Sequence, residues 1–379
     1  MPHHQERSID SSHFSADILD LILALADFLF RAAVLISVMS PKHSPLSCDC
    51  CAHIEVSRRS FLKTTLGGLA AAGTGAIPLL ASQPGEPSAV TGGTSETLVT
   101  TLYQSLTDEQ RKAVVFPFDH PLRSKVDNNW YITKQRVGTD FTPDQQAMIR
   151  EIFLKMHNPE YADRVIKQVE HDAGEPGFGA CSIALFGEPG VGKFEFVLTG
   201  RHVTRRCDGD SVEGAAFGGP IFYGHAALSD DEAADHPGNI YWYQAQRANE
   251  VFKMLDGKQR QLALLEKSRG EHGTETVAIS GKTRELQGIP VSELSRDQKE
   301  HVHLVMSDLL APFRKQDADE AVKLIKANGF DNLHLAFYKN PDIGNDGVWD
   351  VWQIEGPAMV WYFRGAPHVH TWVHIRQQA

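Results

Sequence analysis

The sequence predicts an α+β fold, with helices first and mainly antiparallel strands in the middle and at the C-terminal end. Leu98, Leu102 and Leu106 recur at helical spacing. Short runs rich in β-forming residues occupy the middle of the chain, and turn-separated strands follow residue 333. Helices and strands occur in blocks and do not alternate regularly. We therefore expect one α+β domain over residues 96–379, with its helices packed against the strands.

The composition sets limits on the class of protein. The chain has 379 residues, of which 42% are hydrophobic, so it can bury a sizeable core. Its net charge is -11, whereas nucleic-acid binding needs a basic face. We therefore expect no nucleic-acid partner. Cys181 and Cys207 lie in the predicted domain, and they are either a disulfide or two buried thiols.

A targeting signal precedes the predicted domain. The run Ser57–Lys63 reads SRRSFLK, and a weakly apolar Gly/Ala-rich segment follows it up to Ala81. This order is similar to a twin-arginine export signal. We assign residues 57–82 to the signal and residues 83–95, rich in Pro, Gly, Ser and Thr, to a linker. The twin-arginine export machinery is then a partner, and the location is periplasmic or extracellular.

Residues 1–56 form an N-terminal extension ahead of the signal. An export signal normally starts shortly before its arginines, so Met39 is an alternative start. The apolar stretch 18–39 contains Asp20, Asp27 and Arg31, which argue against a membrane span. We expect no stable span in the mature chain.

Capping signals and hydrophobic periodicity predict the helices. Thr107 begins a Thr-x-x-Gln capping box, and Thr142 followed by Pro143 is typical of a helix start. Ser295 caps a further helix. The predicted helices cover residues 96–115, 142–171 with breaks, 241–268, 295–313 and 318–327.

Strand signals fall in two groups. Residues 180–186, 194–199 and the segment around Val203 form the first group, and 269–294 is a loop or a short strand. The second group is a C-terminal meander with turns at 345–347 and 356–357. Its predicted strands cover residues 333–338, 348–355, 358–364 and 371–375.

The stretch Gly187–Phe194, GEPGVGKF, is close to a nucleotide-binding P-loop. Phe194 stands where the Ser or Thr that binds magnesium would be, and the residues after it favour a strand over a helix. Pro189 and Gly190 form a turn dipeptide. We therefore interpret the stretch as a hairpin turn and expect no nucleotide.

Four of the 18 histidines are candidate metal ligands. His368 and His370 lie two apart on a predicted strand, so their rings share a face. His202 closes the strand after the GEP turn, and His225 ends a glycine-rich aromatic loop. Neutral imidazole suits zinc and copper, so we expect one of these two ions at His202, His225, His368 and His370.

The order of several short motifs resembles the family known as domain of unknown function 3500. These motifs are Gly187-Glu-Pro189, Gly200-Arg-His202, Ile354-Glu-Gly-Pro357 and the His-x-His at His368, together with FPFDHPLR over residues 116–123. The resemblance covers about residues 98–375. It implies the fold and export of that family and assigns no activity.

Two functional hypotheses follow. The first is an exported metal-dependent enzyme, either a zinc hydrolase or a copper oxidoreductase, with Glu188 or Glu355 as general base. The second is a non-catalytic exported binding module, whose aromatic surface would stack on a glycan or another planar small-molecule ligand. That surface would consist of Phe217, Phe222, Tyr223, Tyr241, Trp242 and Tyr243. Clustering of His202 with His368 and His370 would favour the enzyme.

Overall fold

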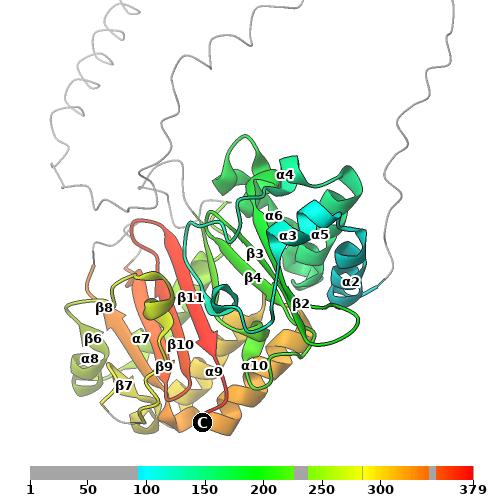
Figure 1. The fold of residues 1–379 in the computed structure, drawn as a ribbon. Coiled ribbons are helices and arrows are strands. Elements are labelled where there is room, and N and C mark those ends of the chain that lie inside the picture. Colours follow the sequence, from blue (N-terminus) through cyan, green and yellow to red (C-terminus); the bar gives the residue numbers. More distant parts are fainter. Residues whose placement is uncertain (1–92, 226–237, 284, 341–346, 379) are drawn as a thin grey trace, which may run out of the picture. The chain divides into compact units, whose positions relative to one another are not determined.

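The computed structural model describes residues 93–225, 238–283, 285–340 and 347–378. Within these residues, nine α-helices and an eleven-stranded, mostly antiparallel sheet form the α+β fold that the sequence predicts (Figure 1). The extension, the twin-arginine signal and the turn at 345–347 lie wholly or partly outside the described residues, so the predictions made for them stand untested.

The helices occupy two blocks of the chain, one before and one after the first group of strands. The α-helices are α2 (Ser95–Ser105), α3 (Asp108–Val114), α4 (Val137–Asp140), α5 (Pro143–Lys155), α6 (Pro159–Ala173), α7 (Trp242–Met254), α8 (Gly257–Ala263), α9 (Arg296–Leu310) and α10 (Lys315–Asn328). The short 3-10 helices are η2 (Pro121–Ser124), η3 (Gly177–Ala180), η4 (Ala216–Gly218), η5 (Gly273–Val277), η6 (Val291–Glu293) and η7 (Phe330–Asn332).

One sheet contains all the described strands. The strands are β1 (Val115–Phe116), β2 (Ser182–Gly187), β3 (Phe194–Gly200), β4 (Val203–Cys207), β5 (Ile221–His225), β6 (Leu264–Leu265), β7 (Ile289–Pro290), β8 (His334–Tyr338), β9 (Val351–Gly356), β10 (Met359–Arg364) and β11 (Val369–Ile375). Their order is β1-β2-β3-β4-β5-β11-β10-β9-β8-β6, and β7 also pairs with β8. Only the β1–β2 and β6–β8 pairs are parallel.

The pairing of β5 with β11 joins the two groups of strands. These strands run antiparallel, with His370 opposite Gly224 and Val369 opposite His225. In Figure 1 the red strand β11 lies beside the green strands from the middle of the chain. This junction brings His202 and His225 near the C-terminal histidines, although more than 140 residues separate them in sequence.

The two faces of the sheet are covered differently. The larger core cluster packs helices α2, α5, α6, α7, α9 and α10 against one face, which includes Ile221, Tyr223 and Val373. The opposite face carries Phe222, Tyr362 and Trp372 and is covered by residues of loops and of the short helix η5, such as Val126 and Val277. Alternation along β11 therefore places His368, His370, Trp372 and His374 on the loop-covered face.

Capping explains where the helices begin and where one prediction was wrong. Thr107, Thr142 and Ser295 form capping boxes, as the sequence predicts. The single helix expected over residues 241–268 is instead two helices followed by the short strand β6. Leu255 takes an extended conformation, and Asp256 accepts hydrogen bonds from the N–H groups of Lys258 and Gln259, which starts α8.

The GEPGVGKF stretch is a hairpin turn, as interpreted from the sequence. β2 and β3 pair antiparallel on either side of it, and the Glu188 N–H donates to the Lys193 carbonyl at 3.3 Å. A side chain at Gly187 would meet the Lys193 carbonyl oxygen at 2.1 Å, and the φ of Gly187 is +76°, so only glycine fits. No helix begins at Phe194, and this removes the geometry that a P-loop needs.

Two further expectations are resolved by burial. Cys181 and Cys207 are free buried thiols and do not form a disulfide. The binding-module hypothesis is wrong for five of its six residues, because Phe217, Phe222, Tyr223, Tyr241 and Trp242 are all at most 5% exposed and belong to the core. The sixth, Tyr243, is partly buried.

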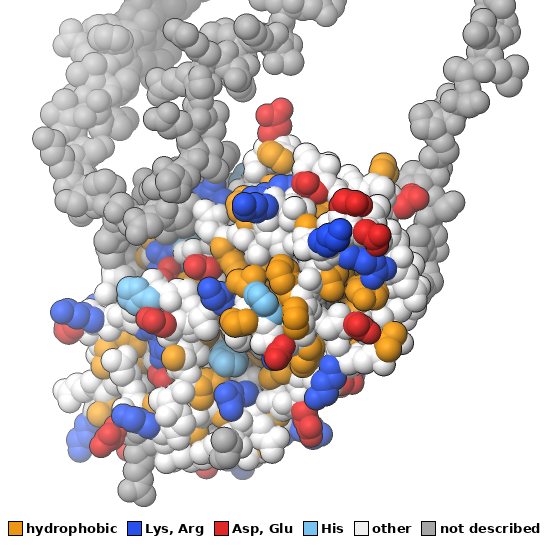
Figure 2. Space-filling view, viewed as in Figure 1, with side chains coloured by type: hydrophobic (Ala, Val, Ile, Leu, Met, Phe, Trp, Pro, Cys, Tyr) orange, Lys and Arg blue, Asp and Glu red, His pale blue; other side chains and the backbone are white. Residues whose placement is uncertain are grey.

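The surface agrees with the charge analysis. On the face seen in Figure 2, basic and acidic side chains are interspersed and form no single basic patch. Among the helices that the structure describes, none has both the length and the hydrophobicity needed to cross a membrane.

Candidate metal centre

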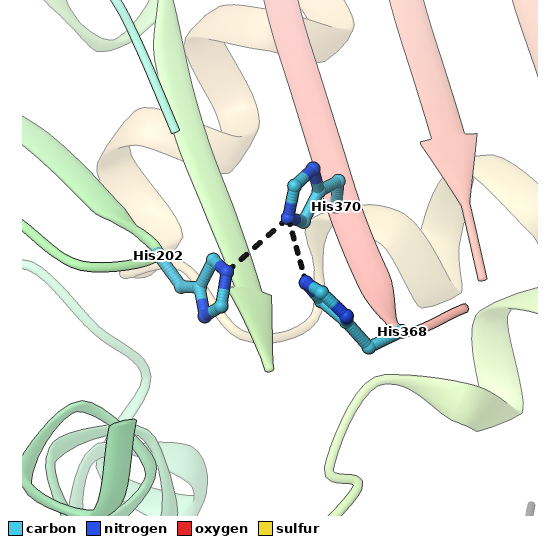
Figure 3. A group of neighbouring side chains, drawn as sticks. All are labelled: His202, His368 and His370. Carbon is cyan, nitrogen blue, oxygen red and sulfur yellow. Dashed lines mark hydrogen bonds between the residues drawn. The ribbon is translucent and has the colours of Figure 1, made fainter. Parts of the chain in front are cut away.

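Three of the four predicted histidines converge at one point. The Nε2 atoms of His368 and His370 lie 3.0 Å apart, and those of His370 and His202 lie 3.2 Å apart. One ligand atom from each ring lies within 4.8 Å of the others, and all three residues are buried. Figure 3 shows the His202 ring approaching from the turn after β3, while His368 and His370 come from the start of β11.

The backbone places His202 in this position. His202 occupies the turn between β3 and β4 with φ +55°, a left-handed conformation that is uncommon for a residue other than glycine. Its N–H donates to the Asn128 carbonyl at 2.8 Å, which fixes the turn. Opposite His370, the absence of a side chain at Gly224 lets β11 and His202 approach closely: an added Cβ would lie 2.3 Å from the Val369 carbonyl oxygen and 3.4 Å from His202 Cβ.

A carboxylate holds the outer nitrogen of two of these rings. His202 Nδ1 lies 2.8 Å from Asp172 Oδ2, and His370 Nδ1 lies 2.8 Å from Glu271 Oε2. Gln168 also donates to Asp172, and Arg364 pairs with the other oxygen of Glu271 at 2.8 Å. Carboxylates placed behind histidines in this way fix the orientation and tautomer of metal ligands.

The electrostatics favour neutral rings. Burial lowers the pKa of His370 well below its usual value, and the charge of Arg364 lowers it further. Burial also lowers the pKa of His202, although the hydrogen bond to Asp172 opposes this. The pKa of Asp172 is lowered: burial raises it, but the hydrogen bonds from His202 and His225 outweigh burial. Asp172 is therefore ionised at neutral pH, and both histidines are neutral.

Neutral rings in this arrangement point lone pairs at one another. Because each carboxylate accepts a proton from Nδ1, His202 and His370 keep bare Nε2 atoms. Two such acceptors 3.2 Å apart repel, and a cation between them removes the repulsion. Nitrogens bound tetrahedrally to one zinc ion at 2.0–2.1 Å lie about 3.3–3.4 Å apart, which is close to the Nε2–Nε2 separations of 3.0 and 3.2 Å.

His225 does not join the cluster. It pairs with Val369 and so lies on the helix-covered face, whereas His370 lies on the loop-covered face. It approaches Asp172 instead, with 3.5 Å between His225 Nδ1 and Asp172 Oδ1. The sequence shows that His225 ends a strand, but the side to which it points depends on which residue of β11 it pairs with.

The structure places neither predicted general base beside the histidines. Glu188 is exposed in the β2–β3 turn, and the whole of β3 separates it from His202, about 20 Å of strand. Glu355 lies two strands from β11, opposite Val360, which pairs with His374 and not with His370. It forms an ion pair with Arg269 at 2.7 Å. Motif order suggested these two residues, but the strand positions place neither of them beside the histidine cluster.

Sequence reasoning missed Asp172 and Glu271. Asp172 lies in the last turn of α6, and Glu271 lies in the loop before η5. Neither has a local pattern that distinguishes it from an ordinary surface carboxylate. The available signal was a run of polar residues around Glu271 for which no regular element was predicted.

The fold and this site define an α+β protein with a candidate three-histidine metal centre. The chain belongs to the family described as protein of unknown function DUF3500, whose model matches residues 91–378. This confirms the resemblance seen in the order of motifs. No curated protein and no solved structure matches the chain.

Proposed function

We propose that this protein is an exported metal-dependent hydrolase that binds one zinc ion through His202, His368 and His370. The observation that carries the proposal is the convergence of three buried Nε2 atoms, two of them on rings held from behind by Asp172 and Glu271. Structural zinc sites use four protein ligands, whereas catalytic sites use three and keep one position for water or substrate.

The proposed reaction class follows from the fourth coordination position of the zinc ion, which the three histidines leave for water or substrate. A zinc ion held by these three histidines would supply a Lewis acid and would lower the pKa of a bound water, which is the chemistry of hydrolysis at a carbonyl or phosphoryl centre. Both carboxylates at the centre are engaged, Asp172 by His202 and Gln168, and Glu271 by His370 and Arg364. Their role is to orient the ligands, and the proton acceptor is another group or the solvent.

The direct test is metal analysis of the mature chain from residue 83, purified after growth with zinc and, separately, with copper. We expect about one zinc per chain and metal-dependent hydrolysis within a panel of nitrophenyl esters and phosphates. His374→Ala is the matched control, because His374 lies on the same strand and face but bonds to the Val277 carbonyl. Metal content far below one per chain in both media contradicts a metal centre; stoichiometric copper in place of zinc contradicts the hydrolase.

Export is a separate part of the proposal and rests on the residues around Arg58 and Arg59. A twin-arginine pathway carries folded proteins, and this suits a site built from distant segments. Replacing both arginines by lysine should retain the precursor in the cytoplasm of an expressing bacterium while leaving its metal content unchanged. Processing and release of the double variant at the normal rate would contradict this route.

A further inference from the structure

Arg205 is a charged side chain inside the helix-covered core. Its Nε donates to His157 Nε2 at 3.1 Å, and its Nη1 donates to the Phe222 carbonyl at 2.6 Å and more weakly to the Thr204 carbonyl. The residue is only 3% exposed. None of these partners is a carboxylate, and no ion pair of Arg205 occurs in the described part of the chain.

The surroundings of Arg205 do not neutralise its charge. The rings of Tyr223 and Phe313 lie 5.5 and 5.6 Å from the guanidinium carbon, which provides a cation–π contribution. His157 is neutral, because burial lowers its pKa to about 3. Buried charges in proteins are normally paired, because an isolated one is costly to desolvate. Arg205 is therefore an uncompensated buried cation among the described residues.

Tyr241 adds a second unsatisfied group beside it. Its hydroxyl is fully buried and makes no hydrogen bond to any residue that the structure describes. The guanidinium of Arg205 is close enough to act on this hydroxyl through its charge. Burial raises the pKa of Tyr241 to about 12, so the hydroxyl keeps its proton and can donate it.

We propose that the Arg205 guanidinium and the Tyr241 hydroxyl form a buried binding site for a small monovalent anion, with chloride as the ligand that fits best. The guanidinium offers only donors, and the protonated tyrosine hydroxyl can donate as well, so the pair suits an anion better than a cation. Because Arg205 is only 3% exposed, the protein would have to enclose the ligand almost completely, which favours a single-atom anion over a large polyatomic one. The site lies on the helix-covered face and does not depend on the metal centre.

The test measures thermal unfolding of the full mature chain while chloride replaces gluconate at constant ionic strength. A ligand that binds only the folded state raises the melting temperature as its concentration passes the Kd. Tyr241→Phe removes only the hydroxyl and should weaken the apparent chloride affinity about tenfold. Tyr243→Phe is the matched control, since that hydroxyl already donates to the Asp308 carbonyl, and it should keep the full response.

A crystal grown in bromide provides the second measurement. We expect an anomalous peak between the Arg205 guanidinium and Tyr241 Oη, and its loss in Tyr241→Phe. If the hydroxyl is simply unsatisfied, Tyr241→Phe will raise the melting temperature equally at every chloride concentration, and this overturns the proposal. A bromide peak without any chloride-dependent stabilisation means binding at crystal concentration only and also overturns it.

Discussion

Two carboxylate networks in this protein differ in whether their partners leave ligand atoms available for a metal ion. Glu195 is fully buried and accepts hydrogen bonds from Arg206 at 2.6 Å and from Arg123 at 2.9 Å. Its partners are permanently charged, so the network needs no further cation. Asp172 and Glu271 instead bind neutral histidines, whose far nitrogens then face one another.

The difference separates a structural network from a candidate site. A carboxylate paired with arginine is complete within the protein, and removing it affects stability. A carboxylate that accepts a hydrogen bond from Nδ1 makes the imidazole ring more basic, so Nε2 binds a metal more strongly. The first three experiments below test this contrast, beginning with the largest expected effect, and the fourth concerns a third group of carboxylates.

Removing one ring should have the largest effect. His370→Ala deletes the histidine that contacts both of the others. If three or four ligands share the ~10–16 kcal/mol of a zinc site, the affinity falls on the order of a thousandfold. Competition against a chelator measures this, with His374→Ala as the control. An unchanged affinity in His370→Ala would place the metal elsewhere.

The arginine network should respond in stability alone. Glu195→Gln leaves Arg206 buried with one fewer carboxylate. We expect a loss of about 3 kcal/mol in the free energy of unfolding, measured with denaturant. Zinc affinity, measured on the folded variant, should stay within twofold of the wild type. A parallel loss of zinc would show that the two networks are coupled, against the separation drawn here.

The carboxylates behind the histidines should have an intermediate effect. Asp172→Asn and Glu271→Gln should each lower zinc affinity by about 10–100-fold, as is typical of residues that orient ligands. Asp172 is the more buried of the two, so its substitution should have the larger effect. Glu170→Gln on the same helix is the control, since Glu170 pairs with exposed Arg150. Equal affinity in all three variants would contradict the orienting role.

A third group of carboxylates, this time near one another, should show a small pH effect. Burial, together with the charges of Asp208, Asp210 and Asp317 and against that of Lys323, raises the pKa of Glu320 to about 7. The folded carboxyl thus holds its proton more tightly than the unfolded one, whose pKa is near 4.5. Stability is therefore lost as pH rises from about 4.5 to 7.

Glu320→Gln removes this ionisation. Since the side chain is partly exposed, we expect the melting temperature to rise only on the order of 1 °C at pH 8, with the difference disappearing near pH 4.5. Calorimetry at the two pH values checks the sign. A variant less stable than the wild type at pH 8 would show that Glu320 makes a favourable ion pair instead.

Much of the fold could be predicted because its signals are local. Thr107, Thr142 and Ser295 reveal helix starts through side chains that bond within the next turn. The long helix predicted over residues 241–268 failed at Asp256, where a local cap interrupts a run of good helix formers. The pairing of β5 with β11 has no local signal, since it joins segments that are distant in sequence.

In the candidate site, too, local signals could be predicted from the sequence, whereas contacts between distant segments could not. The spacing of His368 and His370 was enough to place both rings on one face. His202 was found from its position at a strand end, but the same reasoning also selected His225, which the register with β11 places on the opposite face of the sheet. Asp172 and Glu271 could not be found, because each acquires its role only when α6 and the loop before η5 reach the histidines.

The central place of β11 in the sheet also bears on the order of synthesis. β11 is synthesised after the other ten strands of the sheet, yet it lies between β5 and β10 and pairs with both. Until it emerges from the ribosome, both neighbours present an unpaired edge, and such edges invite pairing with other chains. A chain that ends before residue 368 would lack two of the three histidines and would keep two unpaired strand edges, on β5 and β10.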